Sequence, residues 1–436
     1  MDPNPKRKMC TPDQKDTHSM LVSFNTIKGR WPAVIHKTER IHLGRLKTIV
    51  AHMEKLKDEI FQGARQGETA EKRNNHIKLV RRYYAEASRL PVQSGYVEVP
   101  IEYRQKDGLG RYMCNGNLGL QSMTRKIRQT ICRDYYHDVD IVNAHPNILL
   151  WLCRSNGIPC PFLGEYIDHR ERVLKDIQSN GLRWKGGHVN TRSAAKQFVL
   201  AKVNGSSQKE ALKYAEYKKY AWYLGFCSEI ETIWDEMARL HPDMVAYTLK
   251  QPKKKAWEAP LHARATNRVL LNYENAILMV MNNYFERNSI PCDVLIHDGC
   301  QVRKQKGLKI EEHLRRCEAL IFEETKMDTI KLSVKPMDEH LDLKSLDTPE
   351  FVDDRDRFTK ISAILLKNRS DEEKAFFKQY KTRMARENID GLTGLTGWTV
   401  RDADDLKEAR RHLAADVAAP GKAVFIKAGM GVASDD

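Results

Sequence analysis

The chain has 436 residues, and its 73 Lys and Arg against 58 Asp and Glu give a formal charge of +15. A chain with this excess of positive charge typically binds a polyanion, most often nucleic acid. No apolar stretch approaches the ~20 residues that cross a bilayer, so no membrane partner is expected. The nine cysteines form no C-x-x-C pair. They argue against a zinc site and favour an intracellular compartment, with nuclear, viral and mobile-element settings all open.

The N-terminal part is expected to be a tail followed by helices. Residues 1–18 are polar and basic, which predicts a disordered tail. Apolar residues then recur every three or four positions from Ile41 to Leu56, which predicts a helix. Gly63 and Gly67 break this pattern before a second helix near residues 77–87. We expect residues 19–94 to form a helical thumb-like or accessory arm.

The middle of the chain mixes strand and helix patterns, which predicts an α+β fold. Alternation from Val97 to Tyr103 indicates a strand, and Pro146 stands where a helix is expected to begin. The other predicted strands cover residues 137–142, 294–296, 301–303 and 330–334. The other predicted helices cover residues 123–133, much of 160–250, 265–288 and 310–322.

The C-terminal part is expected to be a linker and the start of another domain. Residues 341–395 predict a linker with small helices. Within residues 396–436, Val424 to Gly431 is typical of a strand that runs into a phosphate loop, but the Gly-Lys-Ser/Thr ending is missing. We expect an incomplete domain, of a helicase-type ATPase, that does not itself hydrolyse ATP. A fused or associated helicase is the expected partner.

Two carboxylate motifs are the strongest candidates for a catalytic site. Asp140 follows a predicted strand, as does Asp298, and Asp138 shares a strand face with Asp140. Two such aspartates can hold two Mg²⁺ ions roughly 4 Å apart, with Mn²⁺ able to substitute. The backbone carbonyl of Ile141 is a candidate additional ligand, and Asp138 is a further one. Each aspartate could otherwise be a helix cap or a turn residue.

A basic helix is predicted between the two motifs. Arg192, Lys196, Leu200 and Asn204 fall on one of its faces. Arg192 and Lys196 would meet the β- and γ-phosphates of a nucleoside triphosphate, and Lys196 could protonate the leaving pyrophosphate. Leu200 offers an apolar surface for a base or sugar. An ordinary basic helix surface would show the same spacing.

Together these segments resemble the family A DNA polymerases and the related single-subunit RNA polymerases. The segment from Asp140 to His145 is similar to the first palm motif, Arg192-x3-Lys196 to the fingers motif, and His297-Asp298-Gly299 to the last palm motif. Their order and spacing fit from about residue 100 to 335. The resemblance implies a right-hand fold, with an antiparallel palm sheet and helical fingers within residues 95–340.

The resemblance also implies roles for further residues. Those expected to contact primer, template or incoming phosphate are Arg111, Gln121, Arg125, Arg128 and His297, although His297 could instead be a packing residue. His145 and Asn204 would flank the nucleotide sugar. The family usually has Glu and an aromatic residue at these two positions, so the choice of sugar stays open. Gly299 stands where the family has a third acidic residue.

The predicted function is template-directed nucleotidyl transfer, as a DNA-directed DNA polymerase that extends a primer 3′-hydroxyl in DNA replication. Asp140, Asp298 and Lys196 would be catalytic, and primer-template nucleic acid and nucleoside triphosphates would be the partners. One alternative is an RNA polymerase or primase on the same fold. A second is an inactive polymerase fold that only binds nucleic acid. A third is a primase of another fold that uses Asp138 and Asp140.

Overall fold

A computed structural model describes residues 31–62, 69–180, 182–184, 187–205, 220–251 and 259–344, with a few positions between 346 and 375. The chain divides into two compact units, residues 1–345 and 346–436. The description below concerns the first unit. The expected tail, the glycine break at residues 63–67 and the expected further domain from residue 396 lie outside the described residues.

The central feature is a four-stranded antiparallel sheet in the order β7-β8-β4-β9. Its strands are β7 (Cys292–Ile296), β8 (Gly299–Arg303), β4 (Tyr136–Ile141) and β9 (Leu332–Lys335). Strand β4 pairs on one edge with β8 and on the other with β9. Four of the five residues of β7 and of β8 are buried, as expected for apolar strands covered on both faces.

A second antiparallel sheet contains β1 (Val34–His42), β2 (Tyr96–Gln105) and β3 (Tyr112–Cys114). Strand β2 confirms the alternation noted from Val97. Strand β1 corrects the prediction of a helix that includes Ile41, because its nine residues pair along the whole length of β2. The pairing partner lies more than fifty positions away in the sequence, so local periodicity could not indicate it. A short two-stranded sheet joins β5 (Arg183–Trp184) and β6 (Gly187–His188).

Four of the described helices lie on or beside the second sheet. They are α3 (Leu43–Ala51), α4 (Met53–Ile60), α5 (Ala70–Ala87) and α6 (Arg125–Cys132), with 3₁₀ turns at Lys106–Gly108, Asn115–Asn117 and Leu120–Ser122. The His42 side chain accepts a hydrogen bond from the Arg45 amide and so caps α3. Two helices therefore follow β1 where one was predicted.

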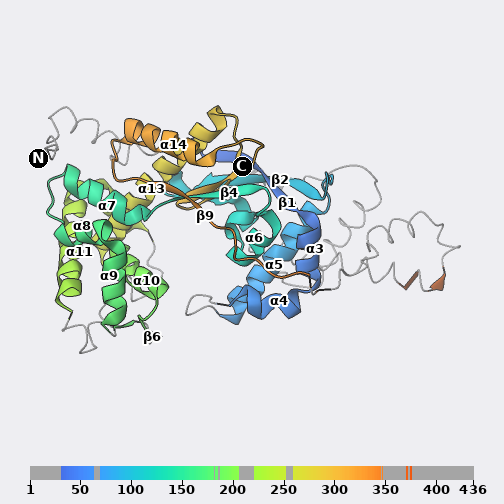
Figure 1. The fold of residues 1–436 in the computed structure, drawn as a ribbon, viewed down its shortest axis with the longest axis horizontal. Coiled ribbons are helices and arrows are strands. Elements are labelled where there is room, and N and C mark those ends of the chain that lie inside the picture. Colours follow the sequence, from blue (N-terminus) through green and yellow to red (C-terminus); the bar gives the residue numbers. More distant parts are fainter. Residues whose placement is uncertain are drawn as a thin grey trace, which may run out of the picture. The chain divides into compact units, whose positions relative to one another are not determined.

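The remaining helices form a group that lies to one side of the four-stranded sheet in Figure 1. They are α7 (Ala144–Ser155), α8 (Pro161–Asp168), α9 (Arg170–Ser179), α10 (Arg192–Val203), α11 (Ala221–Leu240) and α12 (Pro242–Lys250). Helix α13 (Leu261–Arg287) packs on α7, α11, α12 and α14 (Ile310–Thr325). Helix α7 begins two residues before Pro146, with Asn143 in a left-handed conformation at its start.

The described residues therefore have an α+β fold with antiparallel sheets, as predicted. Helix α13 carries many of the buried aliphatic and aromatic side chains, among them Leu270, Tyr273 and Ile277. No helix among the described residues is long and apolar enough to cross a membrane.

Candidate nucleotide and metal site

The fold brings Asp140 and Asp298 to neighbouring strand ends. Asp140 pairs with Gly299 across β4 and β8, and Asp298 lies in the two-residue turn between β7 and β8. The Ile141 amide donates a hydrogen bond to the Asp298 carbonyl oxygen at 2.9 Å, which ties the end of β4 to this turn. His297, the other turn residue, has a φ of +51°, a value that is uncommon for a residue with a side chain.

The two carboxylates affect each other electrostatically. Burial, followed by repulsion from Asp298, raises the pKa of Asp140 to about 7, although Lys335 acts in the opposite direction. Burial also raises the pKa of Asp138, and the positive charge of Arg128 is the main influence that lowers it. A buried carboxylate whose charge is disfavoured beside a second carboxylate fits a divalent cation, because Mg²⁺ prefers oxygen ligands and would neutralise negative charge there.

A lysine that the sequence did not single out also reaches this pair. Lys335 on β9 lies two residues beyond Ser333, which pairs with Asp140. Its Nζ is 2.5 Å from Asp140 Oδ2. The structure thus places a positive charge of the chain itself where a cation would bind. Among the described residues, no group of three or more His, Cys, Asp or Glu side chains forms a ready-made metal site.

Helix α10 carries Lys196 towards the aspartates. Burial lowers the pKa of Lys196, and the charges of Asp140 and Asp298 act to raise it. Lys196 is therefore within electrostatic reach of both carboxylates. Arg192, one turn earlier, is exposed and pairs with Glu171 of α9 at 2.5 Å. Leu200 on the same helix is half-buried. The structure thus brings Lys196 to the site, while Arg192 would have to leave Glu171 to contact a phosphate.

A buried Glu274 organises the base of the site. Its carboxylate accepts two hydrogen bonds from Arg111, at 2.5 and 2.8 Å, and lies 2.9 Å from His145 Nε2. Burial would raise the pKa of Glu274, but the contacts with Arg111 and His145 lower it to about 2. Its side chain is only 1% exposed. Glu274 thus fixes Arg111 and His145, two predicted site residues that come from separate segments.

The same group of contacts reaches the end of α10. His145 Nδ1 is 2.5 Å from Asn204 Oδ1, and the Asn267 side-chain amide donates to that oxygen at 3.2 Å. Gly205 follows with a φ of +84°, and a Cβ there would lie 2.9 Å from Ala263 Cβ. The structure therefore brings His145 and Asn204 together, and it fixes the end of α10 to α7 and α13.

The residues predicted to contact a strand have different surroundings. The Gln121 amide is buried and donates to the carbonyl oxygens of Tyr112 and Leu295. Arg125 is exposed and pairs with Glu339 at 2.6 Å. Arg128 is buried near Asp138. Burial lowers the pKa of His297, and no described residue hydrogen-bonds its Nδ1. Gln121 thus joins the backbones of Tyr112 and Leu295. The charges of Arg125 and Arg128 act on Asp138.

Sequence patterns missed Glu274 and Lys335 for different reasons. Glu274 lies on the apolar face of a predicted helix, four residues after Leu270, and a charge in that position was a usable signal. Lys335 follows a short predicted strand, where a lysine is ordinary. Only the pairing of β9 with β4 shows that it reaches Asp140.

The comparisons with known proteins give a partial match. No known family model matches the chain. A protein of Sputnik virophage named "Putative helicase V13" is 27% identical over 281 residues, which cover 63% of this chain and 34% of that protein. The chain thus spans about a third of the relative's length.

This finding corrects the predicted function. A helicase-named relative contradicts a DNA-directed DNA polymerase, and it matches neither an RNA polymerase or primase nor an inactive polymerase fold. The predicted nucleotidyltransferase function in DNA replication is therefore wrong. The motifs misled because each has only two or three residues, and paired carboxylates beside a basic helix suit any chemistry of a Mg²⁺-bound polyphosphate. The resemblance of the fold itself stays a prediction.

Proposed function

We propose that this chain is the part of a helicase-type viral protein that binds a Mg²⁺-bound nucleoside triphosphate beside a nucleic-acid strand. The observation that carries this proposal is the position of Asp140 and Asp298 at adjoining strand ends, with Lys196 of α10 close enough for their charges to act on it. The name of the virophage relative supports action on nucleic acid. Strand separation would be the activity of the whole protein, of which this chain is a part.

The sheet would hold the cation, and α10 would hold the phosphates. Asp140, Asp298 and the Ile141 carbonyl would supply oxygen ligands, with Asp138 on the same strand as Asp140. When bound, Mg²⁺ neutralises phosphate charge and so eases cleavage of a phosphoanhydride bond. Lys196 would bind the outer phosphates, joined by Arg192 if it leaves Glu171. His145 and Asn204 would position the sugar.

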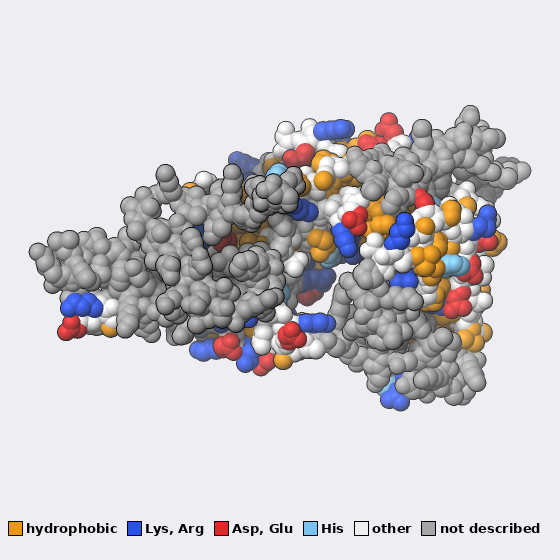
Figure 2. Space-filling model, turned by 180° about the vertical axis from the view of Figure 1, so that it is seen from behind, with side chains coloured by type: hydrophobic (Ala, Val, Ile, Leu, Met, Phe, Trp, Pro, Cys, Tyr) orange, Lys and Arg blue, Asp and Glu red, His pale blue; other side chains and the backbone are white. Residues whose placement is uncertain are grey.

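The charge of the chain suits the second partner. Its net charge of +15 favours a polyanion. Figure 2 shows several Lys and Arg side chains near the middle of one face. Helix α6 begins at Arg125, and Arg128 lies one turn later. The two residues place positive charge near Asp138. A strand that contacts them would pass beside the carboxylate pair.

Nucleotide binding tests the proposal directly. A fluorescent ATP, carrying a methylanthraniloyl group on its ribose, should bind the chain with Mg²⁺ and lose affinity at least tenfold with EDTA. Asp298→Asn and Asp140→Asn should each remove the Mg²⁺ dependence. Asp235→Asn, an exposed carboxylate on α11 paired with His262, is the control and should behave as the wild type. Binding that ignores EDTA and both site variants would refute the site.

A further inference from the structure

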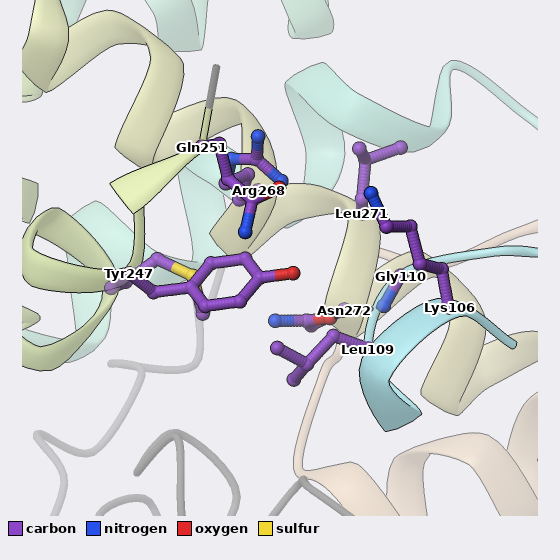
Figure 3. A pocket seen from close by; sticks show the side chains of 9 residues that line it. Lys106, Leu109, Gly110, Tyr247, Gln251, Arg268, Leu271 and Asn272 are labelled. Atoms are coloured by element: carbon purple, nitrogen blue, oxygen red, sulfur yellow. Dashed lines mark hydrogen bonds between the residues drawn. The ribbon is translucent and has the colours of Figure 1, made fainter. Parts of the chain in front are cut away.

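A pocket of about 270 Å³ opens between α12, α13 and the turn after β2, and neither Asp140 nor Asp298 lines it. Figure 3 shows its lining, with the Tyr247 hydroxyl directed from α12 towards the turn that carries Leu109 and Gly110. Asn272 and Leu271 of α13 lie on the other side. None of the roles discussed above involves this pocket.

Hydrogen bonds hold the walls of the pocket in place. Tyr247 donates to Asp107 Oδ2 at 2.8 Å, which links α12 to the turn. The Gly110 amide donates to Asn272 Oδ1 at 2.7 Å, which links the turn to α13. The Gln105 side chain donates to the Gly110 carbonyl at 2.6 Å. Gly110 itself has a φ of +69°, which favours glycine. The pocket is therefore formed before any ligand binds.

The lining residues define the chemistry of a ligand. Lys106 and Arg268 are the charged residues that line the pocket, so it attracts an anion. The Arg268 guanidinium lies 5.3 Å from the centre of the Tyr247 ring, where it can face a phosphate while it supports the ring. The nearest carboxylate that the structure shows in contact with a lining residue is Asp107, which accepts the hydrogen bond from Tyr247.

The uncharged residues add selectivity for a flat polar ring. Tyr247 offers an aromatic ring, and Leu109 and Leu271 offer apolar surface. Gln251 and Asn272 bring side-chain amides, and the Asn272 oxygen already accepts from Gly110, which leaves its NH₂ group to donate. An aromatic ring, amides and two cations together fit a nucleobase with its phosphate.

We propose that this pocket binds one nucleotide unit, through base contact with Tyr247 and phosphate contact with Lys106 and Arg268. The unit could belong to a nucleic-acid strand or be a free nucleotide. The inference extends the proposed function, because Gly110 precedes Arg111 and Asn272 lies two residues before Glu274. The pocket and the Glu274 contacts thus share the turn at Gly110–Arg111 and helix α13.

Oligonucleotide binding by fluorescence anisotropy tests this pocket, with a labelled single-stranded DNA and a labelled single-stranded RNA as probes. Tyr247→Ala should weaken binding about tenfold, the order expected for the loss of one stacked base. Tyr247→Phe keeps the ring and loses only the bond to Asp107, so it should stay within about twofold of the wild type. Lys106→Ala should weaken binding, while Lys250→Ala, a matched exposed lysine on α12, should not.

Measuring AMP binding and oligonucleotide binding to the same variants distinguishes a free nucleotide from a strand as the ligand. If AMP binding depends on Tyr247 and oligonucleotide binding does not, the pocket takes a free nucleotide. If oligonucleotide binding depends on Tyr247, it takes a strand. If Tyr247→Ala binds both AMP and the oligonucleotide as the wild type does, with an unchanged thermal unfolding curve, the proposed role of the pocket is wrong. Its binding should persist in EDTA and in Asp298→Asn, so failure of the Mg²⁺ site and failure of the pocket give different results.

Discussion

Lys335 Nζ lies 2.5 Å from Asp140 Oδ2, so the chain itself supplies a cation to the carboxylate pair. A divalent ion that binds Asp140 must displace or share this ammonium group. We therefore expect Lys335→Ala to bind Mn²⁺ several-fold more tightly than the wild type, measured by electron paramagnetic resonance of the free ion. Lys331→Ala is the matched control, because Lys331 pairs with Glu318 instead. Weaker Mn²⁺ binding in Lys335→Ala would show that the lysine supports the site.

Removal of the Glu274 charge should destabilise the fold. Glu274→Gln would leave Arg111 and His145 without their common partner in a buried place, and the loss of one partner of a buried pair typically costs about 3–5 kcal/mol. Arg111 is 30% exposed, so we expect the lower part of that range. Urea unfolding gives the value. The control is Glu339→Gln, which breaks an exposed pair with Arg125 and should cost less than about 1 kcal/mol. Equal costs would contradict a structural role for Glu274.

Gly299 should tolerate no side chain. A Cβ there would clash with the Val139 carbonyl oxygen and lie 3.0 Å from Asp140 Cα, which would push β8 away from β4. We expect Gly299→Ala to lower the free energy of unfolding by several kcal/mol. Gly164→Ala on α8 meets nothing within 4 Å and should be neutral or slightly stabilising. Thermal melting followed by circular dichroism compares the two, and similar melting temperatures would disprove the clash.

Glu39 should make stability fall as the pH rises. It is fully buried, and burial, opposed by hydrogen bonds from Leu120 and two tyrosines, raises its pKa to about 7. The folded state therefore keeps a proton that the unfolded state has already lost above its ordinary pKa of 4.5. Stability from this group is present below about pH 4.5 and is lost up to about pH 7. Glu39→Gln should flatten that slope in urea unfolding at a series of pH values. A slope unchanged by the substitution would assign it to other groups.

The sequence predicted most of the central sheet, because each strand carries its own apolar pattern. Strands β4, β7 and β8 follow runs such as Val294 to Ile296, and α13 follows a helical period that is visible without a partner. Strand β1 was missed because its apolar residue Ile41 also starts the three- and four-residue spacing that α3 and α4 continue, and only the pairing with β2 assigns it to a strand. Local pattern and long-range pairing therefore conflicted at Ile41, and pairing prevailed.

The candidate site could be predicted only where a residue type is itself unusual. Asp140 and Asp298 end apolar strands, where a carboxylate is conspicuous, and Lys196 follows at a helical spacing from Arg192. Lys335 and Glu274 depend on tertiary contacts that no short pattern encodes. The same limit explains the wrong function, since residue types specify a charge arrangement before they specify a reaction.

Strand β4 lies between β8 and β9, and both partners come from the last part of the described chain. During synthesis, both hydrogen-bonding edges of β4 stay open until residues 299–335 have left the ribosome. Pairing across such a distance is slow, and open strand edges favour aggregation. Asp140 and Asp298 can therefore come together only after β8 has been synthesised. Truncation before β9 would turn β4 from a central strand into an edge strand with one unpaired side.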